Sequence, residues 1–201
     1  MLQRRYLLGL DLGQASDYTA LSVIEQVWNS DIRGYNYNLT YLHRSKIGTP
    51  YPNVVSGVKK LIWKPELRKD CSDPPYLIVD KTGVGAPVVD MFNATGVRPI
   101  SITITGGMKY SHVPNGYHVP KRDLVMRLVT LFQTGRFKIA AGIPLGDILI
   151  SELKNFKVKI NTATGNDSYE AWRDKEHDDL VLSVSLACWF GQHKFDRRGQ
   201  L

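Results

Sequence analysis

An apolar run that stops at a carboxylate constrains the fold of this chain more than any other feature. The run Tyr6–Leu12 contains Asp11 near its end, and after a turn at Gly13 a second apolar run begins near Ala20. This pattern predicts a buried strand, a turn and a returning strand. A carboxylate at the edge of a core is rarely buried unless it is paired or bound to a cation. Asp11 is therefore either a turn residue with Asx-type hydrogen bonds or part of a metal or phosphate site.

The remaining patterns predict a mixed α/β sheet of five strands. Runs rich in strand-forming residues follow the first pair at 35–44, 76–80 and 98–105. The first three strands follow one another through short turns, which predicts an antiparallel meander. Residues 76–105 are predicted as strand, helix and strand, an order that favours parallel pairing through a right-handed crossover.

Helices are predicted on the sides of this sheet, with a late hairpin. Apolar residues at helical spacing begin at or near Tyr51, Ala86, Pro120, Pro144 and Leu180. The last of these helices is apolar nearly all round as far as Trp189, which is typical of a buried helix. Residues 156–160 and 168–172 surround a Gly-Asn turn and predict a β-hairpin.

Length and composition favour one soluble domain. The 201 residues suit a single sizeable core, and we expect a domain at 1–193 with a C-terminal tail at 194–201. The longest uncharged apolar stretch, 180–190, is too short to cross a bilayer, and the N-terminus lacks a signal-peptide pattern. Two cysteines, Cys71 and Cys188, are too few for a disulfide scaffold, which favours a reducing compartment. We therefore expect a soluble, cytoplasmic protein.

The net charge of +7 favours a nucleic-acid partner only weakly. Basic residues occur in pairs along the chain: Arg4-Arg5, Lys59-Lys60, Lys121-Arg122 and Arg197-Arg198. Such pairs suit a surface that contacts phosphates. They equally suit a basic soluble protein without such a partner, so the charge alone does not decide.

Three of the predicted elements carry a carboxylate at one end. Asp11 ends the first strand, Asp80 ends the fourth, and the last helix starts at Asp178 and Asp179. If the first and fourth strands are parallel neighbours, Asp11 and Asp80 lie side by side at the edge where open α/β sheets bind ligands. The last helix can bring its acids to the same edge. Each acid alone also has an ordinary alternative, as a turn residue in a strand end or as a helix N-cap.

Carboxylates gathered at one point favour a divalent cation. Like charges raise one another's pKa unless a cation neutralises them. Mg²⁺ and Mn²⁺ prefer oxygen ligands, and two such ions activate water and stabilise the leaving oxygen in phosphodiester hydrolysis. The histidines and cysteines show no zinc-ligand spacing, and the sequence contains neither a Gly-x-Ser-x-Gly elbow nor a Walker A motif.

At these residues the sequence resembles the nuclease domain of the large terminase subunit of tailed bacteriophages. The matching segments are residues 9–13 with 17–20, residues 79–85 and residues 177–181. That family has the ribonuclease H-like fold, which it shares with Holliday-junction resolvases and retroviral integrases. The resemblance implies three antiparallel strands followed by two parallel ones, the order predicted above.

The resemblance also implies an activity, a site and partners. It implies a Mg/Mn-dependent endodeoxyribonuclease, a hydrolase that uses two Mg²⁺ or Mn²⁺ ions to cut concatemeric viral DNA during genome packaging. The implied catalytic metal ligands are Asp11, Asp80, Asp178 and Asp179. Asp17 matches a further recurrent acid of the family. The implied partners are double-stranded DNA, a packaging ATPase domain, the small terminase subunit and the portal, without a membrane.

Other functions are compatible with parts of the sequence. Full-length large terminases carry an N-terminal packaging ATPase that is missing here, so we expect an excised domain or a stand-alone relative. An actin-like ATPase or sugar-kinase-type phosphoryl-transfer domain is one alternative, because residues 9–13 and Thr19 resemble the first phosphate loop of that superfamily. Such proteins need two similar domains and a second phosphate loop. A Holliday-junction-resolvase-like nuclease and a catalytically inactive nucleic-acid-binding domain are further alternatives.

DNA contacts are predicted next to the second acid and around a loop at residues 106–117. The cationic and aromatic candidates are Lys81, Lys109, Tyr110, His112, Lys121, Arg122 and Arg127. Contacts of this kind position the phosphate backbone without reading bases. For Lys121 and Arg122, the solvated first turn of a helix explains the sequence equally well.

Overall fold

A computed structural model describes residues 3–14, 17–71, 73–155 and 178–196 of the chain. Within these residues, eight strands form one sheet: β1 (Arg4–Asp11), β2 (Ala20–Asn29), β3 (Gly34–Arg44), β4 (Tyr76–Asp80), β5 (Ile100–Thr105), β6 (Ser111–Val113), β7 (Gly116–Pro120) and β8 (Phe137–Ile139). The helices are α1 (Tyr51–Ile62), α2 (Gly85–Ala94), α3 (Lys121–Gln133), α4 (Gly146–Asn155) and α5 (Asp179–Lys194), with a short 3-10 turn at Pro65–Leu67.

The strand order is β6-β7-β5-β4-β1-β2-β3-β8. β1, β2 and β3 form the predicted antiparallel meander, and β4 lies parallel to β1 on one side and to β5 on the other. The predicted order of three antiparallel strands and then two parallel ones is therefore confirmed. In the β1–β4 register Leu10 pairs with Val79, which puts the next residues, Asp11 and Asp80, side by side.

The sheet is larger than the five strands predicted. Residues 106–117, predicted as a loop, contain β6 and the start of β7, which form a hairpin closed by Asn115 with a φ of 63°. β8 adds to the opposite edge by pairing in parallel with β3. β6 and β8 have three residues each, too few for an alternating pattern to identify a strand. The late hairpin predicted at 156–160 and 168–172 lies outside the described residues.

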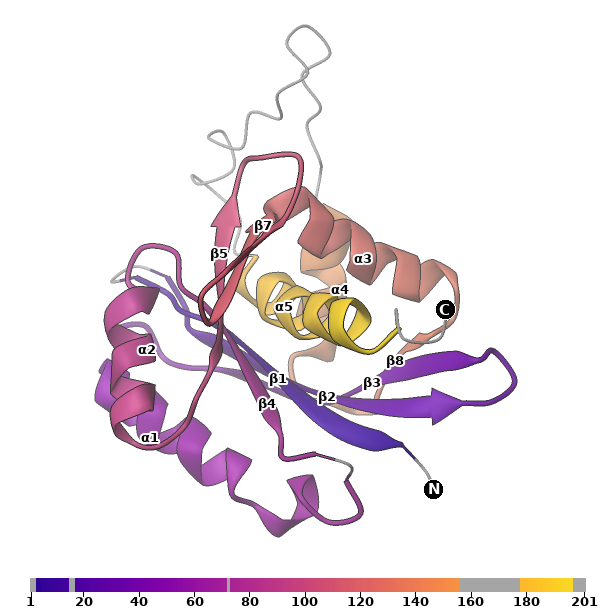
Figure 1. Cartoon of the computed structure of the whole chain (residues 1–201), viewed down its shortest axis with the longest axis horizontal. Helices are drawn as coiled ribbons and strands as arrows, with labels where there is room; N and C mark the ends of the chain where they lie inside the picture. The colour runs from indigo at the N-terminus through magenta and orange to yellow at the C-terminus, as the bar shows by residue number, and fades with distance from the viewer. Residues whose placement is uncertain (1–2, 15–16, 72, 156–177, 197–201) are drawn as a thin grey trace, which may run out of the picture.

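The sheet separates two hydrophobic clusters. α3, α4 and α5 cover one face, and α1 and α2 cover the other (Figure 1). Along β1, Leu7 belongs to the first cluster, whereas Leu8 and Leu10 belong to the second. Because both faces are covered, β1 and β4 are almost continuously apolar. A carboxylate is accommodated only where these strands end.

α5 crosses the middle of the sheet and is buried along most of its length (Figure 1). A Cβ added to Gly9 in β1 would lie 1.8 Å from the carbonyl oxygen of Ser183 in α5, so glycine is required for this close approach. Gly9 lies two residues before Asp11, and Ser183 lies one turn after Asp179. The contact therefore places the first turn of α5 over the end of β1. No helix in the described parts of the chain, α5 included, has the length and hydrophobicity needed to cross a membrane.

Residues 194–196, which the sequence assigns to the predicted C-terminal tail, are among the described residues. α5 continues through Lys194, and Phe195 is buried in the core. Asp196 forms an ion pair with Arg136 at 2.6 Å. Lys194 and Asp196 are charged, so the local sequence does not indicate that this segment packs against the core. The domain boundaries themselves stay predictions.

Candidate active site

Charged residues meet where the parallel strands of the sheet end. Asp11 ends β1, Asp80 ends β4, and Arg44 ends β3, which runs in the same direction as β1. Lys121 directly follows β7, a strand parallel to β5, so it lies at the same edge of the sheet. The first turn of α5 brings two more acids to this edge.

Asp11 and Asp80 form a buried carboxyl pair, with 9% and 8% of each residue exposed. Burial raises the pKa of Asp11 well above its usual range; the charges of Asp80 and of the α5 acids raise it further, and Lys121 lowers it. Burial also raises the pKa of Asp80, although hydrogen bonds with Thr82 and Asp11 oppose this. Without a cation, the pair therefore keeps a proton at a pH where isolated aspartates have lost theirs.

The ordinary alternatives explain only part of this arrangement. Asp80 does act as a turn residue, because its Oδ1 accepts a hydrogen bond of 2.8 Å from the N–H of Thr82. Asp178 occupies the N-cap position of α5, but its side chain makes no capping hydrogen bond. Its Oδ2 instead lies 2.6 Å from Nζ of Lys121. A capping role therefore does not explain why a carboxylate stands at Asp178.

Asp179 is held in a buried network. The guanidinium of Arg44 donates to both of its oxygens, from Nε to Oδ2 at 2.8 Å and from Nη2 to Oδ1 at 3.1 Å. Nη2 also bonds to Glu152 in α4, and Oε2 of Glu152 accepts a hydrogen bond of 3.3 Å from the N–H of Val181. Glu152 thus caps the first turn of α5 in place of Asp178. Burial and the charge of Asp179 raise the pKa of Glu152 to about 7, although Arg44 lowers it.

Arg44 and Glu152 are missing from the site predicted from sequence. Arg44 carried one usable signal, since it ends a strand at the same edge as Asp11. Glu152 carried none, because its partners Val181 and Arg44 lie 29 and 108 residues away along the chain. A helical pattern alone assigns such a charged residue to the solvent side.

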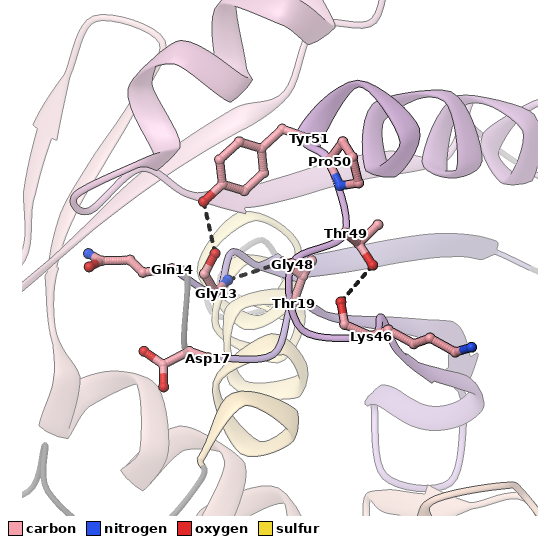
Figure 2. Close-up of a pocket in the computed structure, with 9 residues that line it drawn as sticks. All are labelled: Gly13, Gln14, Asp17, Thr19, Lys46, Gly48, Thr49, Pro50 and Tyr51. Carbon is pink, nitrogen blue, oxygen red and sulfur yellow. Dashed lines mark hydrogen bonds between the residues drawn. The ribbon is translucent and has the colours of Figure 1, made fainter.

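A pocket of about 280 Å³ opens between the turn after β1 and the segment leading into α1 (Figure 2). Asp17 and Lys46 both line it, and their side chains extend in opposite directions in Figure 2. Tyr51 donates a hydrogen bond of 2.9 Å to the carbonyl oxygen of Gly13, whose own N–H donates to Oγ1 of Thr19 at 3.2 Å. The structure thus places Asp17, predicted as a possible additional acid, on this pocket.

Several of the predicted DNA contacts lie open to solvent. The side chains of Lys81, Lys109 and His112 are exposed, and Lys81 directly follows the second acid of the pair. Lys121 and Arg122 are half-buried at the start of α3. None of these five side chains is buried, so each could reach DNA. Their assignment to DNA stays a prediction.

The other two candidates support packing. The ring of Tyr110 packs edge-on against Trp189 in α5, with 5.7 Å between ring centroids. Arg127 pairs with Asp123 at 3.1 Å, and its Cζ lies 5.7 Å from the centroid of Trp189. Tyr110, just before β6, and Arg127 in α3 therefore both pack against α5, whatever their role toward DNA.

No family model matches the chain. Over 182 residues, 90% of its length, the chain is 25% identical to a protein of Thermus phage G20c called "Terminase, large subunit". The chain is a relative of the terminase large subunit. It spans 31% of the length of that protein, and a protein of Thermus virus P23-45 with the same description matches equally.

Solved structures identify the part of the terminase subunit to which the fold corresponds. The large terminase nuclease of phage G20c superposes with a TM-score of 0.58 at 20% identity, covering 94% of this chain and 82% of that one. The nuclease domain of the large terminase of bacteriophage SPP1, a crystal structure with bound Mn, superposes with a TM-score of 0.54 at 13% identity over 94% and 86% of the two chains. The ribonuclease H-like fold of this terminase relative is thereby confirmed.

This terminase relative offers oxygen ligands to a divalent cation. Among the residues described, no three His, Cys, Asp or Glu side chains are close enough to form a complete metal site. The two acids of α5 are instead paired with cations, Asp179 with Arg44 of β3 and Asp178 with Lys121 of α3. Asp11 and Asp80 still fit Mg²⁺ or Mn²⁺, since these ions bind through one or two carboxylates and complete their shell with water and substrate phosphates.

Proposed function

We propose that this chain is a metal-dependent DNA endonuclease that cuts concatemeric viral DNA during genome packaging. The observation that supports this most directly is the buried pair of Asp11 and Asp80 at the ends of adjacent parallel strands. A cluster of carboxylates with this much burial is unfavourable unless a cation binds there. The relationship to terminase large subunits supports DNA as the substrate.

The proposed cofactors are two Mg²⁺ or Mn²⁺ ions, and the Mn bound in the SPP1 nuclease domain supports this choice of metal. The proposed catalytic ligands are Asp11, Asp80, Asp178 and Asp179. Bound there, the ions would activate water and stabilise the leaving oxygen of the phosphodiester. The chain itself contributes a rigid sheet edge that fixes the carboxylates, and Lys81 and Lys121 beside them to contact DNA phosphates.

The first turn of the chain favours a nuclease over a phosphoryl-transfer ATPase. A phosphate loop binds its ligand through free backbone N–H groups. Here the N–H of Gly13 donates to Oγ1 of Thr19 at 3.2 Å, and a Cβ on Gly13 would lie 2.4 Å from the carbonyl oxygen of Asp17. Gly13 therefore packs directly against the segment that leads into β2, as expected of a hairpin that holds Asp11 at the end of β1.

In the complete system we propose that this nuclease domain, residues 1–193, acts on double-stranded DNA in the cytoplasm of an infected cell. Its proposed partners are a packaging ATPase domain, the small terminase subunit and the portal. The similarity to large terminase subunits, of which the chain spans 31%, supports this assignment.

The test is the nicking of supercoiled plasmid DNA in Mg²⁺ or Mn²⁺ and in EDTA. Asp11→Asn and Asp80→Asn should each slow metal-dependent nicking by more than about 100-fold, because the loss of even an outer-shell partner of a metal typically reduces activity 10–100-fold. Asp90→Asn is the matched control, since Asp90 is exposed on α2, and it should leave the rate unchanged. Nicking that is unaffected by EDTA or by Asp80→Asn would exclude the proposal, and a strong preference for four-way junctions would favour the resolvase-like alternative.

A further inference from the structure

The first turn of α5 is clamped by side chains from three other parts of the fold. Arg44 from β3 and Glu152 from α4 surround Asp179, and their side chains are only 14%, 8% and 8% exposed in that order. The ring of Tyr18, in the segment that follows Asp11 and leads into β2, lies 4.8 Å from Cζ of Arg44. We call Arg44, Glu152 and Asp179 the α5 clamp.

The α5 clamp is not needed merely to attach the helix. α5 is already buried along most of its length, and Gly9 allows it to lie directly on β1. Buried ion pairs also contribute little net stability compared with apolar residues of similar size, because each charge loses its hydration. What such a pair does supply is a fixed geometry, since a planar guanidinium holds both oxygens of one carboxylate in a defined orientation.

We propose that Arg44 is a positioning residue of the nuclease site, which fixes the Asp179 carboxylate and, through Glu152, the first turn of α5 relative to Asp11 and Asp80. Arg44 donates one hydrogen bond to each oxygen of Asp179, and an ionised carboxylate has about four lone-pair sites. Hydrogen bonds to a metal ligand from a second layer of residues typically orient it in this way. The inference rests on the proposed function, because it concerns the orientation of a proposed metal ligand.

The decisive variant keeps the charge and removes the geometry. In Arg44→Lys the positive charge stays, but an ammonium cannot reproduce the planar fork of a guanidinium. The matched control is Arg136→Lys at the other end of α5, where Arg136 pairs with Asp196 at 2.6 Å with side-chain exposures of 24% and 18%. Both variants replace an arginine that anchors α5. Only Arg44 lies next to the carboxylates of the candidate site.

The measurement is Mn²⁺ binding to the DNA-free protein by isothermal titration calorimetry, together with the electron paramagnetic resonance spectrum of the bound Mn²⁺ and the melting temperature. We expect Arg44→Lys to weaken Mn²⁺ binding about 10-fold and to change the spectrum. Arg136→Lys should lower the melting temperature without changing either property. Glu152→Gln, which keeps the shape of the side chain, should weaken Mn²⁺ binding in the same direction and serves if Arg44→Lys does not fold.

The possible results separate this inference from the proposed function. Equal Mn²⁺ affinity and spectra in the wild type, Arg44→Lys and Glu152→Gln would show that the α5 clamp is only a structural anchor. Tighter Mn²⁺ binding in Arg44→Lys would show that Arg44 competes with the metal for Asp179, which also overturns the positioning role. If the wild type neither binds Mn²⁺ nor nicks DNA, the proposed function fails as well.

Discussion

The two ends of α5 are anchored in the same way but lie in opposite electrostatic surroundings. At the N-terminal end Arg44 pairs with Asp179 and lies over Tyr18, and at the C-terminal end Arg136 pairs with Asp196 and lies 5.7 Å from the ring centroid of Tyr37. Each pair ties the helix to the sheet. The chemistry of the two anchors is therefore closely matched.

The difference lies in the charges around each pair. Near Asp196 the cations predominate, because Arg136 and Arg127 both lower the pKa that burial raises. At the N-terminal end, one further cation, Lys121, is outnumbered by four further carboxylates: Asp11, Asp80, Asp178 and Glu152. Cations therefore outnumber the single carboxylate at the C-terminal end of the helix, whereas negative charge is in excess at the N-terminal end. The candidate site is thus located by an imbalance of charge and not by any single residue type.

The largest expected effect is a stability difference of opposite sign between two acids of the same site. Asp179→Asn removes a partner of a buried arginine and should destabilise the metal-free protein by about 3 kcal/mol. Asp11→Asn removes a charge that burial and the neighbouring acids disfavour, so at pH 8 it should stabilise the metal-free protein. The measurement is urea unfolding in EDTA.

Asp196→Asn is the control for this comparison at the other end of α5. It also breaks an Arg–Asp pair, but the side chains there are more exposed, at 24% and 18%, so it should destabilise the protein less than Asp179→Asn. Equal destabilisation by Asp11→Asn and Asp179→Asn would mean that the charge at the N-terminal end is already balanced.

Local sequence patterns were sufficient to predict the two acids that stand at the ends of strands. Apolar strands that end in an acid, together with the crossover rule, predict that Asp11 and Asp80 are neighbours, and the register of Leu10 with Val79 confirms this. Most of the fold was also predictable, because apolar residues recur at regular spacing along the long strands and helices. β6 and β8, with three residues each, are too short to show such spacing.

The ion pairs and hydrogen bonds between residues far apart in the sequence were not predictable. Arg44 reaches Asp179 over 135 residues of sequence, and no local pattern marks such a partner. The N-cap interpretation of Asp178 failed because Lys121, from another helix, competes for its carboxylate. Glu152 supplies the missing cap from α4. Ion pairs with distant residues, and not the local sequence, therefore determine the partners of the two α5 acids.

The same imbalance predicts how stability depends on pH. In the folded metal-free protein the pKa values of Asp11, Asp80 and Glu152 are raised, that of Glu152 to about 7. Unfolded carboxyl groups titrate near pH 4, so between about pH 4 and 7 the folded state holds more protons than the unfolded state. The free energy of unfolding should therefore be highest near pH 4 and fall by roughly 2 kcal/mol as the pH rises to 7, apart from opposing contributions of groups elsewhere.

This prediction is checked by urea unfolding at several pH values in EDTA and again in Mg²⁺. A bound cation replaces the protons, so Mg²⁺ should reduce or reverse the decline. Glu152→Gln should remove part of it, whereas Glu66→Gln, at the exposed turn after α1, should not. Stability that rises between pH 5 and 7 in EDTA, with the same slope in Glu152→Gln, would contradict the assignment of excess negative charge to this end of α5.

The smallest expected effect concerns Lys121, the second cation at this end of the helix. Its pair with Asp178 is partly exposed, at 19% and 26% of the two side chains, so Lys121→Ala should change stability by less than about 1 kcal/mol. If Lys121 also contacts DNA, the variant should weaken binding and make the slope of log K against log salt less negative by about 1. Fluorescence anisotropy of labelled duplex DNA in EDTA measures this slope without cleavage, with Lys60→Ala on α1 as the control. An unchanged slope would make Lys121 a counter-ion of the site carboxylates and not a DNA contact, and the DNA path would then have to be sought along Lys81 and Lys46.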